Sequence, residues 1–444
     1  MRINIITLGC SKNTVDSEKL AGHLTAAGHK VFFDRQMTCA TNGSNRYYND
    51  CDTVIINTCG FIGDAKEESI NTILLAAKNK PHKLIVCGCM VERYKEDLRK
   101  EIPEVDAWFG VHEWDQIVES LKDPKVPKAL KDTNDPKGPN SRPLSTPPHY
   151  AYLKIAEGCN RSCSYCAIPL IRGAHKSIPI DELVEEAKML VKKGVKELLV
   201  ISQDTTYYGL DLYRRRALGE LLDRLADESG AQWIRLHYTY PSSFPLDAIE
   251  VIRRHPNICN YIDIPLQHIN TRILSSMQRG IDHEGTLRLI DTFRRQLPDV
   301  AIRTTLIVGY PGETREEFEE LKDFVRQARF DRMGCFAYSP EEGTAAYRLP
   351  DDVDPDEKER RVSELMAIQE QISLEKNQAR IGHTFRVLVD RIDDEFIVGR
   401  TEYDSPEIDD EVLIPIGKEC VQPGDFVNVL ITDALENDLM GKLV

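Results

Sequence analysis

The stretch from Glu157 to Pro169 reads EGCNRSCSYCAIP, and it contains Cys159, Cys163 and Cys166 with no fourth cysteine nearby. Thiolates select zinc or iron–sulfur clusters among the metals that proteins bind. A structural zinc site takes four ligands, usually from two cysteine pairs, whereas this stretch supplies one compact group of three. A 4Fe-4S cluster held by three cysteines keeps one iron free to bind another molecule. The spacing therefore favours an iron–sulfur cluster with an open position, with a zinc or ferredoxin-like module as the alternative.

The cysteines follow the first of several strands predicted in the middle of the chain. Apolar runs that predict strands lie at residues 150–158, 196–202, 233–238, 261–266, 301–309 and 332–339. Amphipathic helical stretches such as residues 180–194 separate them, so we expect a partial or complete β/α barrel over residues 150–380. The active site of such a barrel lies at the carboxyl ends of its strands. The three cysteines are therefore predicted to lie where barrel chemistry takes place.

The regions on either side of this barrel have other patterns. Residues 1–121 alternate short apolar runs with amphipathic helices, which predicts a doubly wound parallel sheet. Residues 122–149 are rich in Pro, Lys, Asp, Asn and Ser and are predicted to be a linker. Residues 381–444 hold short strand-like runs with no helix between them, which predicts a small β-barrel. We therefore expect an α/β chain of three domains.

Composition and charge narrow the class of protein further. The 444 residues are 41% hydrophobic and 29% charged, and they contain no apolar run of about 18 residues and no cleavage signature of a secretory peptide. We expect a cytoplasmic protein, in which the twelve cysteines serve metal binding, catalysis or burial rather than disulfides. The net charge is -15, and residues 381–444 alone carry fifteen Asp and Glu against five Lys and Arg, or -10. Such acidity argues against nonspecific nucleic-acid binding and suits a basic partner.

The cysteine spacing resembles that of the radical S-adenosylmethionine (SAM) enzymes, in which C-x3-C-x2-C follows the first barrel strand and an aromatic residue, here Tyr165, precedes the last cysteine. The run TTLIVGYPGET at residues 304–314 resembles the SAM-contacting G-x-P-G-E-T loop of the same family. The resemblance implies that the cluster on the three cysteines binds SAM and splits it to a 5'-deoxyadenosyl radical. The residues expected to contact SAM are Tyr165, Gln203, Gly309, Pro311, Gly312 and Glu313. A Gly-Pro turn with no ligand is the alternative explanation of that loop, but beside the cysteine triplet we favour a loop that binds SAM.

A second set of cysteines lies in the N-terminal region. Cys10, Cys59 and Cys89 each end a predicted strand, at the rim of a doubly wound sheet where ligands gather. Three thiolates on one rim can hold a second cluster, although burial in apolar strands accounts for such cysteines equally well. Cys87, two residues before Cys89, is predicted to point to the opposite side of its strand and into the core. Cys39, Cys51, Cys259, Cys335 and Cys420 follow no pattern and are interpreted as structural or incidental.

The contexts LGC-x2-N-x2-DSE, NTC-x3-GDAKEES and GC-x3-RY resemble the methylthiotransferases, a branch of the radical SAM family. The resemblance implies that Cys10, Cys59 and Cys89 hold a second 4Fe-4S cluster that carries the sulfur to be inserted, and that residues 381–444 form a TRAM domain. The stretch QMTCATNGSNRYYND at residues 36–50 departs from the family by lengthening the loop between the first two of these cysteines.

Two features favour a protein substrate over transfer RNA. The motif DIPLQH at residues 263–268 resembles the methylthiotransferases that modify an aspartate of the twelfth small-subunit ribosomal protein, whereas the enzymes that modify an adenosine of transfer RNA usually show PLQSG. The acidic C-terminal barrel would repel RNA and attract a basic ribosomal protein, although acidity serving only solubility is common. The transfer-RNA enzyme is the alternative function, and a non-catalytic electron-transfer protein with two clusters is a third.

The expected reaction replaces one hydrogen on the β-carbon of the target aspartate with a methylthio group. The resemblance implies two 4Fe-4S clusters, SAM, the ribosomal protein as substrate, and an electron donor such as a flavodoxin or ferredoxin. We expect no membrane partner and no direct RNA binding. Gln203 and Asp204 end the second strand and are predicted to line the barrel mouth, while His268 is either catalytic or a hydrogen-bonded scaffold group.

Overall fold

The computed structural model describes residues 1–34, 51–79, 81–122, 142–417 and 420–444. The chain forms two compact units, the first made of residues 1–146 with 167–174 and the second of residues 147–166 with 175–444. The unusual loop at residues 36–50 and most of the predicted linker lie outside the described residues. None of the described helices is long and apolar enough to cross a membrane.

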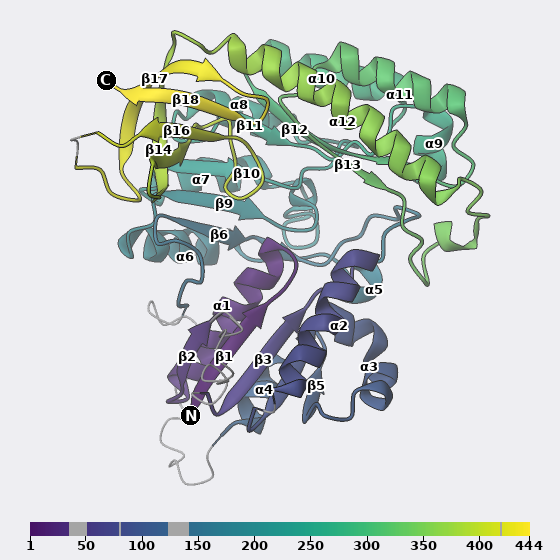
Figure 1. Ribbon diagram of the computed structural model, residues 1–444, viewed down its shortest axis with the longest axis vertical. Coiled ribbons are helices and arrows are strands. Elements are labelled where there is room, and N and C mark those ends of the chain that lie inside the picture. Colours follow the sequence, from purple (N-terminus) through teal and green to yellow (C-terminus); the bar gives the residue numbers. More distant parts are fainter. Residues whose placement is uncertain (35–50, 80, 123–141, 418–419) are drawn as a thin grey trace. The chain divides into compact units, whose positions relative to one another are not determined.

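The first unit is built on a five-stranded parallel sheet (Figure 1). The strands lie in the order β2 (Lys30–Phe33), β1 (Arg2–Thr7), β3 (Thr53–Thr58), β4 (Leu84–Gly88) and β5 (Ala107–Phe109). The central strands are buried apolar runs, as expected for a sheet covered on both faces. The two edge strands, β2 and β5, are short and only partly buried, and the sequence pattern did not reveal them.

Helices cover both faces of this sheet, which confirms the predicted doubly wound arrangement. Helices α1 (Ser11–Ala26) and α4 (Trp114–Ser120) pack in one apolar cluster with strand residues such as Ile5. Helices α2 (Gly63–Lys78) and α3 (Cys89–Glu101) pack in the other, with residues such as Ile56. The short helix α5 (Ile168–Arg172) also belongs to this unit, although it follows the radical SAM cysteines in the chain.

The second unit begins with an open β/α barrel, which confirms the predicted partial barrel. Its six parallel strands are β6 (Tyr150–Lys154), β9 (Glu197–Ile201), β10 (Trp233–Leu236), β11 (Tyr261–Asp263), β12 (Ala301–Val308) and β13 (Arg332–Ala337). They form two three-stranded sheets, β6-β9-β10 and β11-β12-β13. A single parallel bridge, between Ile234 of β10 and Ile258 just before β11, links the two sheets. Among the described residues β6 and β13 do not pair, so the barrel does not close.

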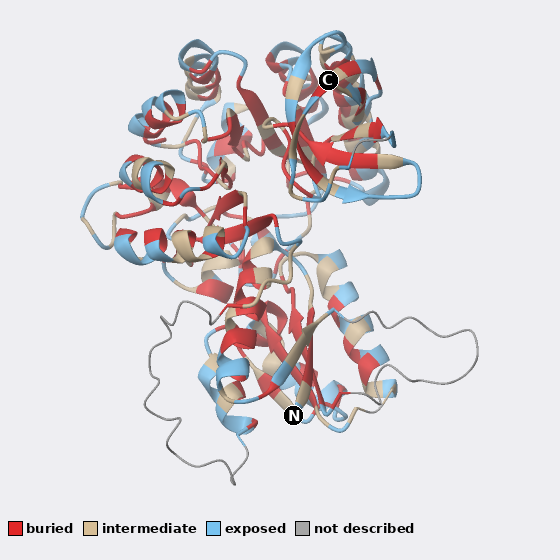
Figure 2. Ribbon diagram, turned by 90° about the vertical axis from the view of Figure 1, so that its left-hand side faces the viewer, coloured by how far each residue is buried: buried red, intermediate tan, exposed pale blue. Residues whose placement is uncertain are grey.

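Helices and small elements connect the barrel strands. The main helices are α6 (Ile180–Lys192), α7 (Leu218–Glu228), α8 (Leu246–Arg254), α9 (Thr271–Ser276), α10 (His283–Gln296), α11 (Arg315–Ala328) and α12 (Pro355–Gln378). Two-residue strands, β7 (Ala156–Glu157) and β8 (Lys176–Ser177), flank the cysteine loop, and 3-10 turns lie at Thr205–Tyr207 and Ala346–Arg348. Figure 2 shows the barrel strands buried beneath helices whose outer faces are exposed.

The C-terminal residues form the predicted small barrel. Strands β14 (Thr384–Ile392), β15 (Phe396–Arg400), β16 (Glu411–Pro415), β18 (Asp438–Leu443) and β17 (Phe426–Ala434) close in that order. The small barrel packs against the amino-terminal ends of the central strands, where Leu388 meets Trp233, Tyr261 and Ala301. The cysteine loop follows the opposite, carboxyl end of β6. The small barrel therefore does not cover the end of the central barrel that carries the cysteines.

Candidate active site: two groups of cysteines

Cys159, Cys163 and Cys166 lie on a loop after β6 and β7, and each is half-buried. The loop is held by its backbone: the Cys166 amide donates to the Cys163 carbonyl at 3.1 Å, and the Ser164 amide donates to the Met277 carbonyl at 3.0 Å. The Cys159 Sγ accepts a hydrogen bond from the Arg161 amide at 3.4 Å. The structure thus places the triplet at the carboxyl end of the first barrel strand, as the sequence predicted.

A buried arginine reaches the same loop from the other half of the barrel. The Arg279 side chain, in a residue 3% exposed, donates from Nη1 to the Cys163 Sγ at 3.4 Å and to the Tyr165 hydroxyl at 3.3 Å. The Tyr240 hydroxyl lies 3.4 Å from the same Sγ. Burial raises the pKa of the Cys159 thiol to about 11, so an uncompensated thiolate is unfavourable in this loop. A positive charge beside the cysteines offsets that cost.

The Tyr240 ring lies close to two guanidinium groups. Arg161 lies 3.9 Å and Arg279 lies 4.2 Å from the ring centroid. Both distances are within the range of a cation–π attraction. Asp204 holds Arg161 through a 2.6 Å ion pair and is itself almost fully buried. Sequence reasoning found Asp204 but missed Tyr240 and Arg279, because neither stands in a motif.

The other predicted residues of the mouth are also anchored. Gln203 donates from Nε2 to Glu157 Oε1 at 2.8 Å, and its own Oε1 is buried without a hydrogen-bond partner among the described residues. His268 is completely buried, and its Nδ1 accepts from the Asn270 amide at 2.9 Å. Burial lowers the pKa of His268 to about 3, so the ring stays neutral. A buried neutral ring bonded to the backbone favours the scaffold interpretation of His268 over an acid–base role.

The G-x-P-G-E-T loop follows β12 and is tied to two other parts of the barrel. Gly309 has φ +68, and a Cβ there would lie 2.3 Å from the Lys358 Cγ, so only glycine fits. The Glu313 carboxylate accepts from the Tyr310 amide at 3.2 Å and from Arg361 at 2.9 Å, so it fixes the loop from within. The Tyr310 hydroxyl lies 2.9 Å from the Ser164 Oγ and joins this loop to the cysteine loop.

The remaining predicted SAM contacts are carried by this same loop. Pro311 is buried and Gly312 has φ +76, so both contribute backbone rather than reactive side chains. Contact of Gly309, Pro311, Gly312 and Glu313 with SAM stays a prediction. The link through Tyr310 was not found from the sequence, where it was an ordinary tyrosine within the motif.

The N-terminal cysteines lie at the ends of three adjacent strands. Cys10 caps α1 after β1, Cys59 follows β3, and Cys89 opens α3 after β4. These strands are neighbours in the sheet, so their carboxyl ends lie side by side. Gly9 has φ +90, and a Cβ there would lie 2.6 Å from the Cys59 Cβ. The structure therefore brings the Cys10 loop and Cys59 together at one rim.

Cys87 has the environment expected of a core residue. It is fully buried on the other face of the sheet, in the apolar cluster with Ile3 and Ile5. Cys89, by contrast, is 7% exposed, and its Sγ lies 3.6 Å from the Asn13 Oδ1. Burial raises the pKa of the Cys89 thiol to about 12, an effect that the Arg172 guanidinium opposes. Cys87 in β4 thus faces the core, whereas Cys89, two positions later at the start of α3, lies on the other side with the candidate ligands.

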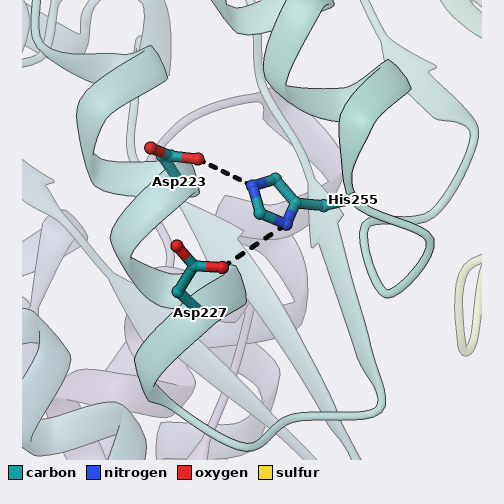
Figure 3. A group of neighbouring side chains, drawn as sticks. All are labelled: Asp223, Asp227 and His255. Atoms are coloured by element: carbon teal, nitrogen blue, oxygen red, sulfur yellow. Dashed lines mark hydrogen bonds and ion pairs between the residues drawn. The ribbon is translucent and has the colours of Figure 1, made fainter.

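Neither cysteine group is arranged for a single metal ion. Among the described residues, the only group of three potential ligands within 4.8 Å of one another is Asp223, Asp227 and His255 (Figure 3). His255 already bonds Asp223 at 2.7 Å, and Arg254 pairs with that same carboxylate, so this group is satisfied by its own charges. Thiolates on a cluster bind different irons and need not converge on one point. Each cysteine group supplies three thiols, the number that a 4Fe-4S cluster with one open position takes, and binding of a cluster to either group stays a prediction.

The open β/α barrel, with its C-x3-C-x2-C loop after the first strand and its glycine loop after the fifth, defines a radical SAM enzyme. The model of the radical SAM superfamily matches residues 153–325, and that of the TRAM domain matches residues 381–444. Residues 2–110 match the uncharacterized protein family UPF0004. Together these matches cover both cysteine groups and the small barrel.

Relatives over the full length define the family more narrowly. The chain is 52% identical over 445 residues to the ribosomal protein uS12 methylthiotransferase RimO of Flavobacterium johnsoniae, covering 99% of this chain and 98% of the relative. It is 50% identical to the protein of that name from Chlorobaculum tepidum, covering 99% and 97%, and 48% identical to that from Bacteroides thetaiotaomicron, covering 100% and 98%. The chain belongs to the family of the ribosomal protein uS12 methylthiotransferases.

Solved structures of similar fold are more distant. The radical SAM methyltransferase TsrM from Kitasatospora setae, solved with cobalamin and an iron–sulfur cluster, is 13% identical with a TM-score of 0.55, covering 83% of this chain and 90% of that one. The cobalamin-dependent radical SAM enzyme OxsB is 11% identical with a TM-score of 0.52, covering 84% and 56%. At these identities the likeness concerns the fold alone.

Proposed function

We propose that this protein is a radical SAM methylthiotransferase that replaces one hydrogen on the β-carbon of an aspartate in ribosomal protein uS12 with a methylthio group. The full-length similarity to relatives of that name supports the substrate. The observation that carries the two-cluster chemistry is the presence of two separate groups of three cysteines, each at the carboxyl ends of parallel strands. Each group leaves one coordination position of a cluster open.

The central barrel has the residues needed to bind a cluster and SAM. Cys159, Cys163 and Cys166 would hold the cluster, and the backbone of the Gly309–Glu313 loop would contact SAM. When bound, the cluster and SAM supply a radical able to abstract hydrogen from an unactivated carbon. Arg279 would offset the negative charge of a Cys163 thiolate, the Tyr240 hydroxyl lies within hydrogen-bond distance of the same sulfur, and the Ser164–Tyr310 hydrogen bond fixes the two loops to each other. The three cysteines are half-buried, and this partial exclusion of water would limit side reactions of such a radical.

We infer that Cys10, Cys59 and Cys89 hold the second cluster, from which the inserted sulfur comes. Two of the three thiols are nearly buried, while Cys10 is exposed at the rim. This combination suits a cluster anchored in the sheet edge and open to a substrate on one side. The three residues are separated by 49 and 30 positions, so only the parallel order of β1, β3 and β4 brings them together.

Fewer acidic side chains of the small barrel are available to a basic substrate than the count of Asp and Glu in the sequence indicates. Asp404 pairs with Arg332, Asp409 pairs with Arg303, and Glu407 accepts from Tyr150, so part of the acidity of the small barrel is used against the central barrel. Among the described residues of 381–444, the exposed acids are Asp393, Asp394, Glu395, Glu407, Asp425, Asp433 and Glu436, and of these Glu407 accepts the hydrogen bond from Tyr150. This remaining surface is still acidic and is suited to a basic ribosomal protein rather than to RNA phosphates.

A direct comparison of substrates tests the proposal. The full chain is reconstituted anaerobically with iron and sulfide, then given SAM and a reductant with uS12 and transfer RNA in parallel, and both products are weighed by mass spectrometry. We expect a methylthio gain on a uS12 aspartate and none with the Cys163→Ala variant. A gain on an adenosine of the RNA instead would identify the transfer-RNA enzyme. SAM cleavage with no gain on either substrate would contradict the assignment of substrate while leaving the radical chemistry intact.

A further inference from the structure

A short segment of the central chain completes the N-terminal cysteine site. Residues 167–174 follow Cys166 directly, yet they belong to the first unit, whose other residues all come from positions 1–146. Within this segment Ala167 and Ile171 pack in one apolar cluster with Cys89 and Val111. The helix α5 therefore buries its apolar side beside a candidate ligand of the second cluster.

The last residue of this helix, Arg172, brings a charge to the same place. It is 3% exposed, and its Nη2 lies 3.2 Å from the Cys89 Sγ. Nη1 forms an ion pair of 2.6 Å with Asp16, and Nη2 also donates to the Asn13 Oδ1 at 2.5 Å. Asn13 in turn donates to the carbonyls of Leu8 and Thr58, which lie next to the Cys10 and Cys59 loops. One guanidinium thus connects to all three cysteine segments.

The hydrogen-bond partners of the buried Arg172 guanidinium differ in charge. Burying an arginine is costly unless its N–H groups are paired. Asp16 supplies the opposite charge, Asn13 supplies a neutral acceptor, and the Cys89 sulfur is a further acceptor. A thiolate at Cys89 would strengthen that last bond, because hydrogen bonds to charged groups are shorter and stronger than neutral ones.

We propose that Arg172 is a positioning residue of the N-terminal cluster, which it stabilises by donating to the Cys89 thiolate and by adding a positive charge beside it. This inference rests on the proposed second cluster at Cys10, Cys59 and Cys89. Hydrogen bonds to the sulfurs and the charge near a cluster set its reduction potential. Arg172 therefore raises the potential of this cluster and couples its integrity to the segment that follows the radical SAM cysteines.

The test isolates the second cluster in the full chain. In a background with Cys159, Cys163 and Cys166 all replaced by alanine, any cluster bound must be held elsewhere. Arg172→Met and Arg172→Lys are compared in this background with Arg99→Met, which removes one exposed positive charge from the same unit. Iron per chain, the electron paramagnetic resonance spectrum of the reduced cluster and its midpoint potential are measured for each.

We expect Arg172→Met to shift the midpoint potential to more negative values and to lose iron, Arg172→Lys to retain part of both properties, and Arg99→Met to match the background. An unchanged potential and spectrum in Arg172→Met would overturn the inference, because a purely structural role would alter only the thermal melting. A background that binds no iron would overturn the proposed second cluster itself, and the inference with it.

A second variant serves as the control for a loss of folding. Asp16→Asn combined with Arg172→Met removes both buried charges together, so no unpaired carboxylate remains. Asp16→Asn alone, in the same background, is the reference for its potential. If the double variant folds, binds a cluster and shows a more negative potential than Asp16→Asn, the inference stands. If it folds and its potential equals that of Asp16→Asn, Arg172 serves the fold alone. If neither variant folds and Arg172→Lys keeps the background potential and spectrum, the inference is likewise overturned.

Discussion

At the scale of single residues, the radical SAM site depends on charge as well as on ligands. Burial raises the pKa of the Cys159 thiol in the half-buried loop, and the Arg279 guanidinium and the Tyr240 hydroxyl contact the neighbouring Cys163. Cys259, by contrast, is a fully buried cysteine of the same unit that packs among aromatic residues with no other cysteine in its cluster. Cys163 therefore has the surroundings of a candidate cluster ligand, whereas Cys259 has those of a packing residue.

Replacing each of them by alanine tests that separation. We expect Cys163→Ala to abolish release of 5'-deoxyadenosine from SAM, because a cluster iron loses its ligand. Cys259→Ala removes a similar volume from the core and should cost about 1 kcal/mol in the free energy of unfolding while leaving SAM cleavage unchanged. Chromatographic analysis of reductant-driven SAM cleavage measures both. Cleavage that survives in Cys163→Ala would refute its role as a ligand.

At the scale of elements, the N-terminal cysteines are placed by the turns that follow parallel strands. The turn between β1 and α1 needs Gly9 for two reasons, its positive φ and the closeness of Cys59. Gly28, just after α1, has a similar φ of +87, but no atom lies within 4 Å of the position that a Cβ would take there. Gly9 and Gly28 therefore share the same backbone strain, but only at Gly9 would an added Cβ clash with neighbouring atoms.

Gly9→Ala and Gly28→Ala therefore have different expected effects. Both should lower the free energy of unfolding by about 1–2 kcal/mol, because L-residues are strained at positive φ. Only Gly9→Ala should also lose iron from the N-terminal site, since its Cβ would lie 2.9 Å from the Cys59 Sγ. Iron analysis in the background lacking the radical SAM cysteines, together with chemical denaturation, measures these effects. Equal iron in the two variants would contradict the placement of Cys59 at the site.

At the scale of the whole molecule, a buried network of charges joins the two barrels of the second unit. Glu197, at the start of β9, is completely buried and binds Arg235 at 2.7 Å and Arg400 at 2.8 Å. Arg400 also pairs with Asp390 of β14 at 2.6 Å. Each charge is paired, so removal of one partner leaves another stranded without water.

Arg400→Met should therefore lower the free energy of unfolding of the second unit by about 3–5 kcal/mol. Arg391, in the neighbouring strand β14, pairs with Glu411 at the surface, with a side chain 52% exposed. Arg391→Met should cost less than about 1 kcal/mol, because exposed ion pairs are screened by water. Urea denaturation of both variants gives the comparison, and similar losses in the two would show that the network does not stabilise this junction.

The same network predicts a loss of stability in acid. Burial by itself would raise the pKa values of Glu197 and Asp390, but Arg400 reverses the effect and holds both below their ordinary values of 4.5 and 3.8. Carboxylates with a lowered folded pKa stabilise the fold fully above their ordinary pKa and lose that contribution as the pH falls through the folded value. We expect the midpoint of urea unfolding to fall steeply below about pH 4.5. The slope should be smaller in Arg400→Met, and an equal slope would contradict the pairing.

The local sequence was enough to predict the features that depend on neighbours along the chain. Cys159, Cys163 and Cys166 lie within one loop, and their spacing alone indicated a cluster. Strands and helices followed from hydrophobic periodicity, because burial of an apolar face depends on residues two or three to four positions apart. The gathering of Cys10, Cys59 and Cys89 was predictable for a related reason, since parallel strands bring their carboxyl ends to one edge.

Only the tertiary structure decided which distant side chains complete these sites and where the charges lie. Arg279, Tyr240 and Arg172 stand in no motif, and packing of elements far apart in the chain brings them to the cysteines. The acidity of residues 381–444 was evident from a count, but its distribution between the surface and pairs such as Asp404 with Arg332 was not. A charge count sums over the chain, whereas the free energy of a charge depends on the partner and the solvent that the fold places beside it.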